Sequence, residues 1–108
     1  GRVFAVVGSP GGGRIIPYVT KAVMGLIDWN MSMADAIALP NATGRGAPTE
    51  VEQTRTPDAV VEALKTLGHD VKVTDFGISV SGLNSIRVTP NGFDAAADPR
   101  REGTVGGD

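Results

Sequence analysis

Val3-Phe4-Ala5-Val6-Val7, followed at once by Gly8-Ser9-Pro10-Gly11-Gly12-Gly13, is the stretch of sequence that decides the fold. The five apolar residues are too few for a helix and rich in β-branched side chains, so they predict a buried strand. A helix-like pattern starts directly after the glycines. Glycines let another molecule approach the main chain, and the first turn of a helix carries unpaired N–H groups and the positive end of its dipole. The junction therefore predicts a site for negative charge, whether a phosphate, a carboxylate or a developing oxyanion.

Composition narrows the classes of protein. The 108 residues make one domain at most, with 41% apolar residues for a modest core. A net charge of −2 with scattered Lys and Arg gives no footprint for nucleic acid. No apolar run approaches the ~20 residues that cross a bilayer, and the lack of cysteine excludes disulfides and thiolate metal sites. Because Gly1-Arg2 leads straight into the strand without a methionine, we expect a fragment, a single incomplete domain over residues 1–108.

Two helices are predicted in the first part of the chain. The first covers residues 14–30, and its apolar residues draw one stripe that should pack on a sheet, namely Ile16, Val19, Val23, Leu26 and Ile27. Trp29 is expected to be a partly buried anchor at its end. The second helix covers residues 33–39, because Ser32 and Asp35 form a capping-box-like pair at its start.

A third helix begins at Thr56-Pro57-Asp58, which supplies a capping hydroxyl, a proline at the first helical position and an acid in the first turn. Gly68 can take the left-handed conformation that ends a helix. Between the second and third helices, residues 41–49 predict an irregular loop and residues 50–52 a short edge strand. The apolar face of the third helix should consist of Val60, Val61, Leu64 and Leu67.

The last part of the chain predicts strands. Residues 71–74 alternate between apolar and polar side chains, as a half-buried strand does. Residues 83–89 and 93–97, joined by the turn Pro90-Asn91-Gly92, predict a hairpin. The tail, residues 98–108, is charged and glycine-rich and is expected to hold no core positions. This order of elements predicts an α+β fold, with helices layered on a mainly antiparallel sheet.

Three familiar uses of a glycine loop do not fit this sequence. A P-loop needs a lysine after its last glycine, where this chain has Arg14. The nucleophile elbow of α/β-hydrolases needs a glycine two positions before its serine, but Val7 stands there before Ser9. The glycine spacing of a dinucleotide-binding fingerprint is also missing. From the residues alone, two alternatives stay open: a tight strand-to-helix turn, and a site for an anion or oxyanion.

Other polar residues favour structural roles. His69 is the single histidine, so it cannot build a metal site, and its place at a turn predicts a solvated side chain. Arg100 and Arg101 are expected to tie down the terminus by ion pairs with the neighbouring acids. Four further acids have the spacing of a solvated rim and a helix cap, namely Glu50, Glu52, Asp58 and Glu62. No residue has the setting of an activated nucleophile. The chain therefore offers a candidate oxyanion hole but no nucleophilic side chain.

Six segments, in the same order, resemble one known family. They are Ser9-Pro10-Gly11-Gly12 before Arg14-Ile15-Ile16, Asp28-Trp29-Asn30-Met31-Ser32, Ala38-Leu39-Pro40-Asn41, Pro48-Thr49-Glu50-Val51-Glu52, Leu67-Gly68-His69-Asp70-Val71 and Asp98-Pro99-Arg100-Arg101-Glu102-Gly103. Together they span nearly the whole chain. The chain resembles the C-terminal part of the small subunit of bacterial γ-glutamyltransferases, also called γ-glutamyltranspeptidases.

The resemblance implies part of the αββα sandwich of N-terminal nucleophile hydrolases and cleavage of γ-glutamyl amides such as glutathione. In that family a threonine at the start of the small subunit forms an acyl-enzyme, which water or an acceptor amine resolves. By position, Gly11 and Gly12 would donate N–H groups to the oxyanion, and Ser9 would join them in contacting the substrate. The implied partners are the large subunit and the N-terminal part of the small subunit. No cofactor and no metal are implied.

The chain also departs from the family pattern. Asn41 stands where many members have arginine, and Gly13 where serine is common. The threonine and the substrate-gripping residues of the family would lie upstream, so we expect the chain alone to be inactive. Family members are typically exported, which implies a periplasmic or secreted protein. The alternatives are a cephalosporin or glutaryl acylase and a non-catalytic α/β module that binds an anion at the glycine loop. The isolated chain could also self-associate through its first strand.

Overall fold

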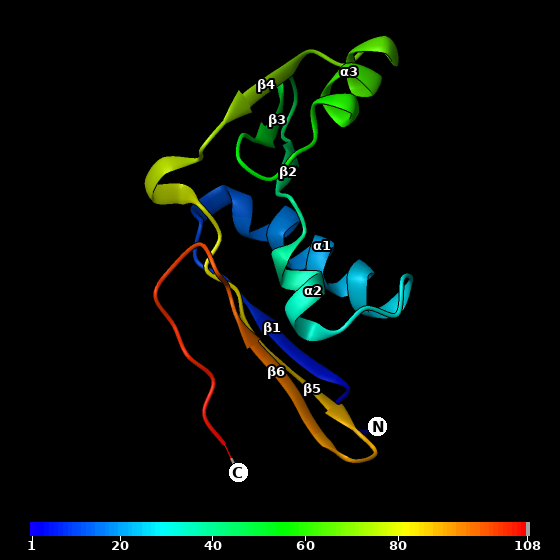
Figure 1. Ribbon diagram of the computed structural model, residues 1–108, viewed down its shortest axis with the longest axis vertical. Coiled ribbons are helices and arrows are strands. Elements are labelled where there is room, and N and C mark those ends of the chain that lie inside the picture. Colours follow the sequence, from blue (N-terminus) through cyan, green and yellow to red (C-terminus); the bar gives the residue numbers. More distant parts are fainter. Residues whose placement is uncertain (108) are drawn as a thin grey trace.

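The computed structural model describes residues 1–107, and Asp108, the last residue of the predicted tail, lies outside the described residues. The chain is α+β, as predicted. Its elements in chain order (Figure 1) are β1 Ala5–Gly8, the short 3₁₀ helix η1 Gly12–Arg14, α1 Ile15–Ile27, α2 Met33–Ala38, β2 Ala42–Gly44, β3 Thr49–Glu52, α3 Asp58–Thr66, β4 Val71–Thr74, the 3₁₀ helix η2 Gly77–Ser79, β5 Asn84–Thr89 and β6 Gly92–Ala97.

Residues 1–107 form two three-stranded sheets that are mainly antiparallel. The first has the order β1–β5–β6, and the predicted hairpin is its β5–β6 pair. The second has the order β2–β3–β4, with β3 and β4 parallel and joined through α3. In Figure 1 the second sheet and α3 lie at one end of the elongated molecule and the first sheet at the other, with α1 and α2 between them.

Two predictions about the second sheet are wrong. Residues 50–52 belong to the central strand β3, not to an edge strand, since β2 and β4 pair on either side of it. The predicted loop over residues 41–49 contains β2, whose central residue Thr43 is buried. The sequence of β2 has no apolar alternation, and its extended conformation comes from pairing with β3, which a local pattern does not reveal.

The core lies where α1 and α2 pack on one face of the first sheet. Gly25 allows the two helices to approach closely, because a Cβ atom at this position would lie 2.8 Å from Cβ of Ala36. The predicted cap of α2 is confirmed: the Ser32 hydroxyl accepts a hydrogen bond of 3.1 Å from the Asp35 amide. The buried cluster consists of Ala22, Leu26, Met33, Ala36, Ile37, Leu83 and Ala96.

The predicted apolar stripe of α1 is only partly right. Ile16 is 75% exposed and Ile27 is also exposed, because α1 turns its small residues toward α2. Besides Leu26, which was predicted, the helix buries Tyr18, Ala22 and Gly25. Trp29 is more than half exposed rather than an anchor. β1 is not a fully buried strand either, since Val6 is 60% exposed. On the outer face of the first sheet, the tail residues 104–106 line a hollow beside Val6 but leave it mostly exposed.

The third helix differs from its prediction at both its start and its face. It begins at Asp58, with Pro57 in the cap position, and the Thr56 hydroxyl has no hydrogen-bond partner within residues 1–107. Of the predicted face Val61 is buried, whereas Leu67 is 77% exposed because α3 covers only the narrow sheet. Gly68 has φ of +95°, and it ends the helix as predicted. No helix in the described residues has the length and apolar character needed to cross a bilayer.

Candidate functional site

The glycine loop between β1 and α1 has a backbone that glycine alone adopts readily. Gly11 has φ of +138° and Gly12 has φ of +57°. A Cβ atom on Gly11 would lie 2.7 Å from Cε2 of Tyr18, so the loop lies directly against that ring. Within residues 1–107, no acceptor takes a hydrogen bond from the amide N–H of Gly11, Gly12 or Gly13. Three free donors therefore gather at the positive end of α1.

Ser9 holds the first half of this loop. Its hydroxyl donates to the carbonyl of Pro10 at 2.7 Å and accepts from the amide of Gly82 at 3.0 Å. The hydroxyl proton is thus engaged within the chain. Ser9 therefore contributes to the shape of the loop that carries Gly11 and Gly12.

Tyr18 packs against Gly11 and supports the glycine loop from the interior of the chain. It is fully buried, and its hydroxyl donates to the carbonyl of Ser79 at 2.8 Å. Its ring meets the Phe76 ring edge-on, with 6.1 Å between centroids. Burial raises the pKa of the Tyr18 hydroxyl, against the opposing effect of the Arg14 charge. Tyr18 therefore acts as a neutral structural donor at ordinary pH. The apolar pattern that predicted α1 does not single it out.

Arg14 ties the end of the loop to the second sheet. Its Nε and Nη2 atoms donate to the Glu50 carboxylate at 3.0 and 2.8 Å, and its guanidinium carbon lies 5.4 Å from the centroid of the Phe76 ring. Thr43 also donates to Glu50. The hydrogen bonds from Arg14 are the main reason that the pKa of Glu50 is lowered. The prediction of a solvated rim is therefore wrong for Glu50.

A buried ion-pair cluster joins the end of β3 to the segment that follows β6. Arg100 donates from Nε and Nη2 to the Glu52 carboxylate at 2.6 and 2.8 Å and from Nη1 to Asp98 at 3.1 Å. All three side chains are at most 5% exposed. Arg100 ties down the tail as predicted, but the expectation that the tail holds no core positions is wrong, and Glu52 is not a solvated acid. The cause is the pairing itself, which makes burial of these charges possible.

The two carboxylates of this cluster stay ionised despite their burial. Burial alone would raise the pKa of Glu52, but hydrogen bonds from Arg100 and the Asn41 amide hold it below its usual value. Likewise, burial would raise the pKa of Asp98, and the Ser81 hydroxyl, at 2.6 Å, heads the hydrogen bonds that lower it. Burial opposes the charge of Arg100 too, but its carboxylate partners raise the pKa of Arg100.

Lys21 extends this cluster toward α1, and the sequence analysis missed it. Its Nζ atom donates to the carbonyls of Ile37 and Leu39 at 3.1 and 2.7 Å and to Oδ1 of Asn41 at 2.8 Å. Burial, together with the charge of Arg100, lowers the pKa of Lys21 to about 7. A cation in the middle of an otherwise apolar helix was the signal that could have indicated a polar contact here.

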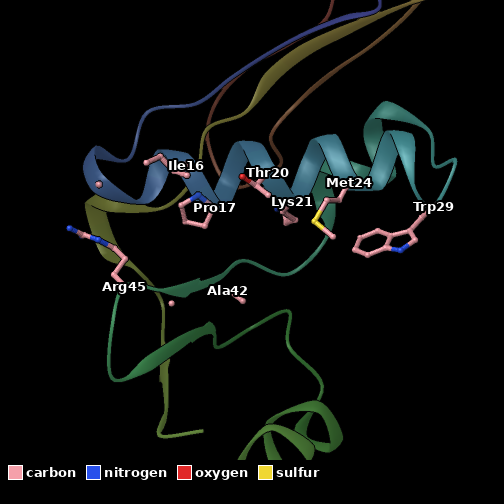
Figure 2. Close-up of a pocket in the computed structure, with 10 residues that line it drawn as sticks. Ile16, Pro17, Thr20, Lys21, Met24, Trp29, Ala42 and Arg45 are labelled. Atoms are coloured by element: carbon pink, nitrogen blue, oxygen red, sulfur yellow. The ribbon is translucent and has the colours of Figure 1, made fainter.

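A groove of about 510 Å³ lies between α1 and the β2 segment (Figure 2). One end lies at Gly13, where a Cβ atom would be 2.7 Å from the Arg45 guanidinium carbon, and the other end lies at Trp29. The lining residues are Gly13, Ile16, Pro17, Thr20, Lys21, Met24, Trp29, Ala42, Gly44 and Arg45.

The remaining candidates lie elsewhere. His69, Asp58 and Glu62 are exposed on α3 or just after it, at the far end of the molecule from the first sheet (Figure 1). No three His, Cys, Asp or Glu side chains in the described part of the chain come together as metal ligands. The arrangement that remains for chemistry is the glycine loop, with its free donors and its supports from Ser9, Tyr18 and Arg14.

Comparisons with known proteins support one family. The sequence model of the family described as Gamma-glutamyltranspeptidase matches residues 1–107. The chain is 36% identical over 105 residues to the Acylase ACY 1 proenzyme of Pseudomonas sp. strain SE83, covering 96% of this chain and 18% of that protein. It is 34% identical over 103 residues to the glutathione hydrolase proenzyme of Escherichia coli K12, covering 93% and 17%. An acivicin-inhibited γ-glutamyltranspeptidase superposes with a TM-score of 0.82 at 32% identity, over 94% of this chain and 55% of that one.

Proposed function

The chain belongs to the gamma-glutamyltranspeptidase family, and we propose that it is the C-terminal segment of the small subunit of an enzyme that cleaves γ-glutamyl amides such as glutathione. The fold is accordingly part of that of the N-terminal nucleophile hydrolases. The chain spans about a fifth or less of the length of the acylase and glutathione hydrolase proenzymes it matches. The activity is therefore proposed for a longer protein, to which this chain contributes one half of the site.

The free amide donors of Gly11 and Gly12 are the observation that carries this proposal. When the threonine hydroxyl of the longer protein attacks the γ-glutamyl carbonyl, the carbonyl oxygen becomes an oxyanion. The two N–H groups would donate to that oxyanion, supported by the positive end of α1. Collapse of the tetrahedral intermediate expels the amine, which takes a proton from the threonine's own ammonium group. Loss of one such donor typically costs about 3 to 4 kcal/mol of transition-state stabilisation.

Ser9 serves the substrate indirectly in this proposal. Since its hydroxyl proton is donated to Pro10 and its oxygen accepts from Gly82, Ser9 fixes the approach to Gly11. The partners that complete the site are the large subunit and the N-terminal part of the small subunit. Without them the chain has no nucleophile, so we expect the isolated chain to be inactive. We propose a periplasmic or secreted location, in keeping with the family resemblance.

A second candidate is an acylase that removes glutaryl-type acyl groups, such as a cephalosporin or glutaryl acylase. The relatives named Acylase ACY 1 proenzyme match this chain at 36 and 35% identity, slightly above the glutathione hydrolase proenzymes. A glutaryl group differs from a γ-glutamyl group by lacking the α-amino group. The same glycine loop would serve both reactions, and the residues that recognise the amino group would decide between them.

The deciding experiment compares γ-glutamyl-p-nitroanilide with glutaryl-p-nitroanilide as substrates for the complete precursor after processing. Both release the same chromophore, so kcat/KM can be compared directly. The proposed function predicts that the γ-glutamyl compound is turned over at least about 100-fold faster, because a site built around a charged group rejects an analogue that lacks it. A preference for the glutaryl compound would replace the proposed function with the acylase.

The proposed role of the loop has its own test. Gly11→Ala forces a side chain into a positive φ and against Tyr18, so the loop must shift. We expect kcat to fall at least about 100-fold with the favoured substrate. Gly68→Ala is the matched control, since it has φ of +95° with open space around it, away from the loop. Equal kcat values for the two variants would show that the loop does not stabilise the transition state.

A further inference from the structure

Arg101 clamps the segment that follows η2. Its Nη2 atom donates to the carbonyls of Ile78 and Val80 at 2.8 and 2.9 Å, and its Nε atom donates to Val80 at 3.2 Å. One planar guanidinium thus bridges two carbonyl groups and donates to the Val80 carbonyl from two nitrogen atoms, which the single nitrogen of lysine cannot do. Ion pairs were predicted for this arginine, but its partners are backbone carbonyls.

The clamped segment, residues 78–82, is also the support of the glycine loop. The Gly82 amide donates to the Ser9 hydroxyl at 3.0 Å, on the approach to Gly11. The Ser79 carbonyl accepts from Tyr18 at 2.8 Å, behind Gly11. Figure 1 shows the yellow segment passing between the blue loop after β1 and the orange-red start of the tail. A displacement of residues 78–82 would therefore reach the loop through both Ser9 and Tyr18.

Gly82 lies between the tail and the loop with no space to spare. A Cβ atom on Gly82 would lie 2.6 Å from Cδ of Arg101 and 3.0 Å from Cγ of Pro10. Gly82 is buried, and the exposed side chains of Arg101 and Pro10 lie directly against it on two sides. The position of the Arg101 side chain is in this way coupled to that of Pro10.

The tail presents Arg101 from a fixed base. The Arg101 amide donates to the Asp98 carbonyl at 3.3 Å, and the Asp98 carboxylate accepts from Ser81 and from the Leu83 amide. Asp98 is buried. The guanidinium is therefore held opposite the two carbonyls by backbone that is itself anchored in the core.

We propose that Arg101 is a positioning residue for the acyl-transfer reaction. By clamping residues 78–82 it holds Gly11 and Gly12 where the oxyanion forms. This inference rests on the proposed function of the glycine loop. Arg101 touches neither substrate nor reacting atoms in this assignment, so its effect is on the transition state and not on the binding of the ground state.

The experiment uses the complete precursor with Arg101→Ala, Arg101→Lys and, as control, the exposed neighbour Glu102→Ala. Steady-state kinetics are measured on processed enzyme and normalised to active sites by burst titration. We expect Arg101→Ala to lower kcat about 10- to 100-fold with KM changed less than about twofold. Arg101→Lys falls between Arg101→Ala and the parent, and Glu102→Ala matches the parent.

Gly82→Ala gives an independent measurement, because it displaces Arg101 and Pro10 without removing the guanidinium. It should lower kcat as well, and the double variant with Arg101→Ala should be no slower than the slower single variant, since both act through one contact. A purely structural role would lower the melting temperature and the yield of processed enzyme and leave kcat per active site unchanged. That result, or fully additive losses, would overturn the inference.

Failure of the proposed function can be told apart from failure of this inference. If the parent enzyme does not turn over γ-glutamyl amides, the proposed substrate is wrong, and the same variants are then measured with the glutaryl anilide. A selective loss of kcat with that substrate would still support the positioning role. Unchanged kcat with whichever substrate the parent accepts would refute it.

Discussion

Two regions of the molecule differ in whether the chain supplies partners for their side chains. Between the two sheets, Arg100, Glu52 and Asp98 are buried and paired within the chain. On the outer face of the first sheet, Val6, Val88 and Phe93 are exposed, and the tail covers this face only in part. The first region has partners for its charged groups, and the second presents an apolar surface.

This difference separates the groups whose partners lie within the described residues from those whose partners do not. The observed supports of the glycine loop, from Ser9, Tyr18 and Arg14, belong to the first kind. In a complete αββα sandwich, the outer face of the β1–β5–β6 sheet would pack against the other large sheet of the sandwich. Substitutions in the two regions should differ in their effect on stability, and the largest losses are expected in the buried ion-pair cluster.

Arg100→Met should have the largest effect on stability. It leaves Glu52 and Asp98 buried without their cation, and removal of one partner from a buried pair costs about 3 to 5 kcal/mol. Urea unfolding of the protein with and without the substitution measures this loss. Lys65→Met is the control, because its pair with Glu62 is exposed. A loss of unfolding free energy below about 1 kcal/mol would mean that the buried cluster contributes no more than an exposed ion pair.

The next largest effect should come from the charge of Lys21. Its pKa in the folded chain is about 7, below the ordinary 10.5, so between these values the unfolded chain binds more protons. The free energy of unfolding should rise from about pH 7 toward pH 10, on the order of a few kcal/mol, and be lowest below pH 7. Lys21→Met should flatten this rise, because the titrating amine is removed. The variant should still fold, because Arg100 still donates to the carbonyls of Ile37 and Leu39. An unchanged pH profile in the variant would contradict the assignment.

The ion pair between Arg14 and Glu50 should have an intermediate effect on the free energy of unfolding. Arg14 and Glu50 join the glycine loop to the second sheet and are partly exposed. Glu50→Gln keeps the shape and removes the charge, and we expect a loss of about 1 kcal/mol. Glu62→Gln is the matched surface control and should change the unfolding free energy by less than about 0.5 kcal/mol. If both variants lose equally little, the link contributes no more than a surface ion pair.

The smallest effect on stability is expected on the outer face of the first sheet, which carries Val6, Val88 and Phe93. Val88→Thr changes an exposed position of β5 and should shift the free energy of unfolding by at most about 0.5 kcal/mol. The same face predicts that the 108-residue chain self-associates when expressed alone. Sedimentation of the parent chain and of Phe93→Lys measures this. A parent chain that stays monomeric at high concentration would refute the expected self-association.

Local signals predicted the elements that local chemistry determines. Ser32 with Asp35, Gly68 and the turn at residues 90–92 each fix their own few residues, and all three predictions are confirmed. The stripe of α1 was only partly right because a helix that contacts both a sheet and a second helix buries small residues such as Gly25. Spacing alone does not show which face meets which neighbour.

Long-range pairing accounts for the rest. Arg14 meets Glu50, and Arg100 meets Glu52, across dozens of residues, and nothing in either local sequence specifies its partner. The free donors of the glycine loop could be predicted because they follow from local backbone chemistry, and the loop's role as a site stays a prediction. Its supports from Tyr18, residues 78–82 and Arg101 depend on tertiary contacts, and the sequence analysis did not find them.

The pairing of Arg100 with Glu52, 48 positions apart, also has a consequence for biosynthesis. Contacts between distant residues form late, since loop closure has to precede them. On the ribosome, β3 and the glycine loop are made well before residues 98–101. The ion-pair cluster and the Arg101 clamp can form only after that segment has left the exit tunnel. The final geometry of the loop is therefore a late event in synthesis.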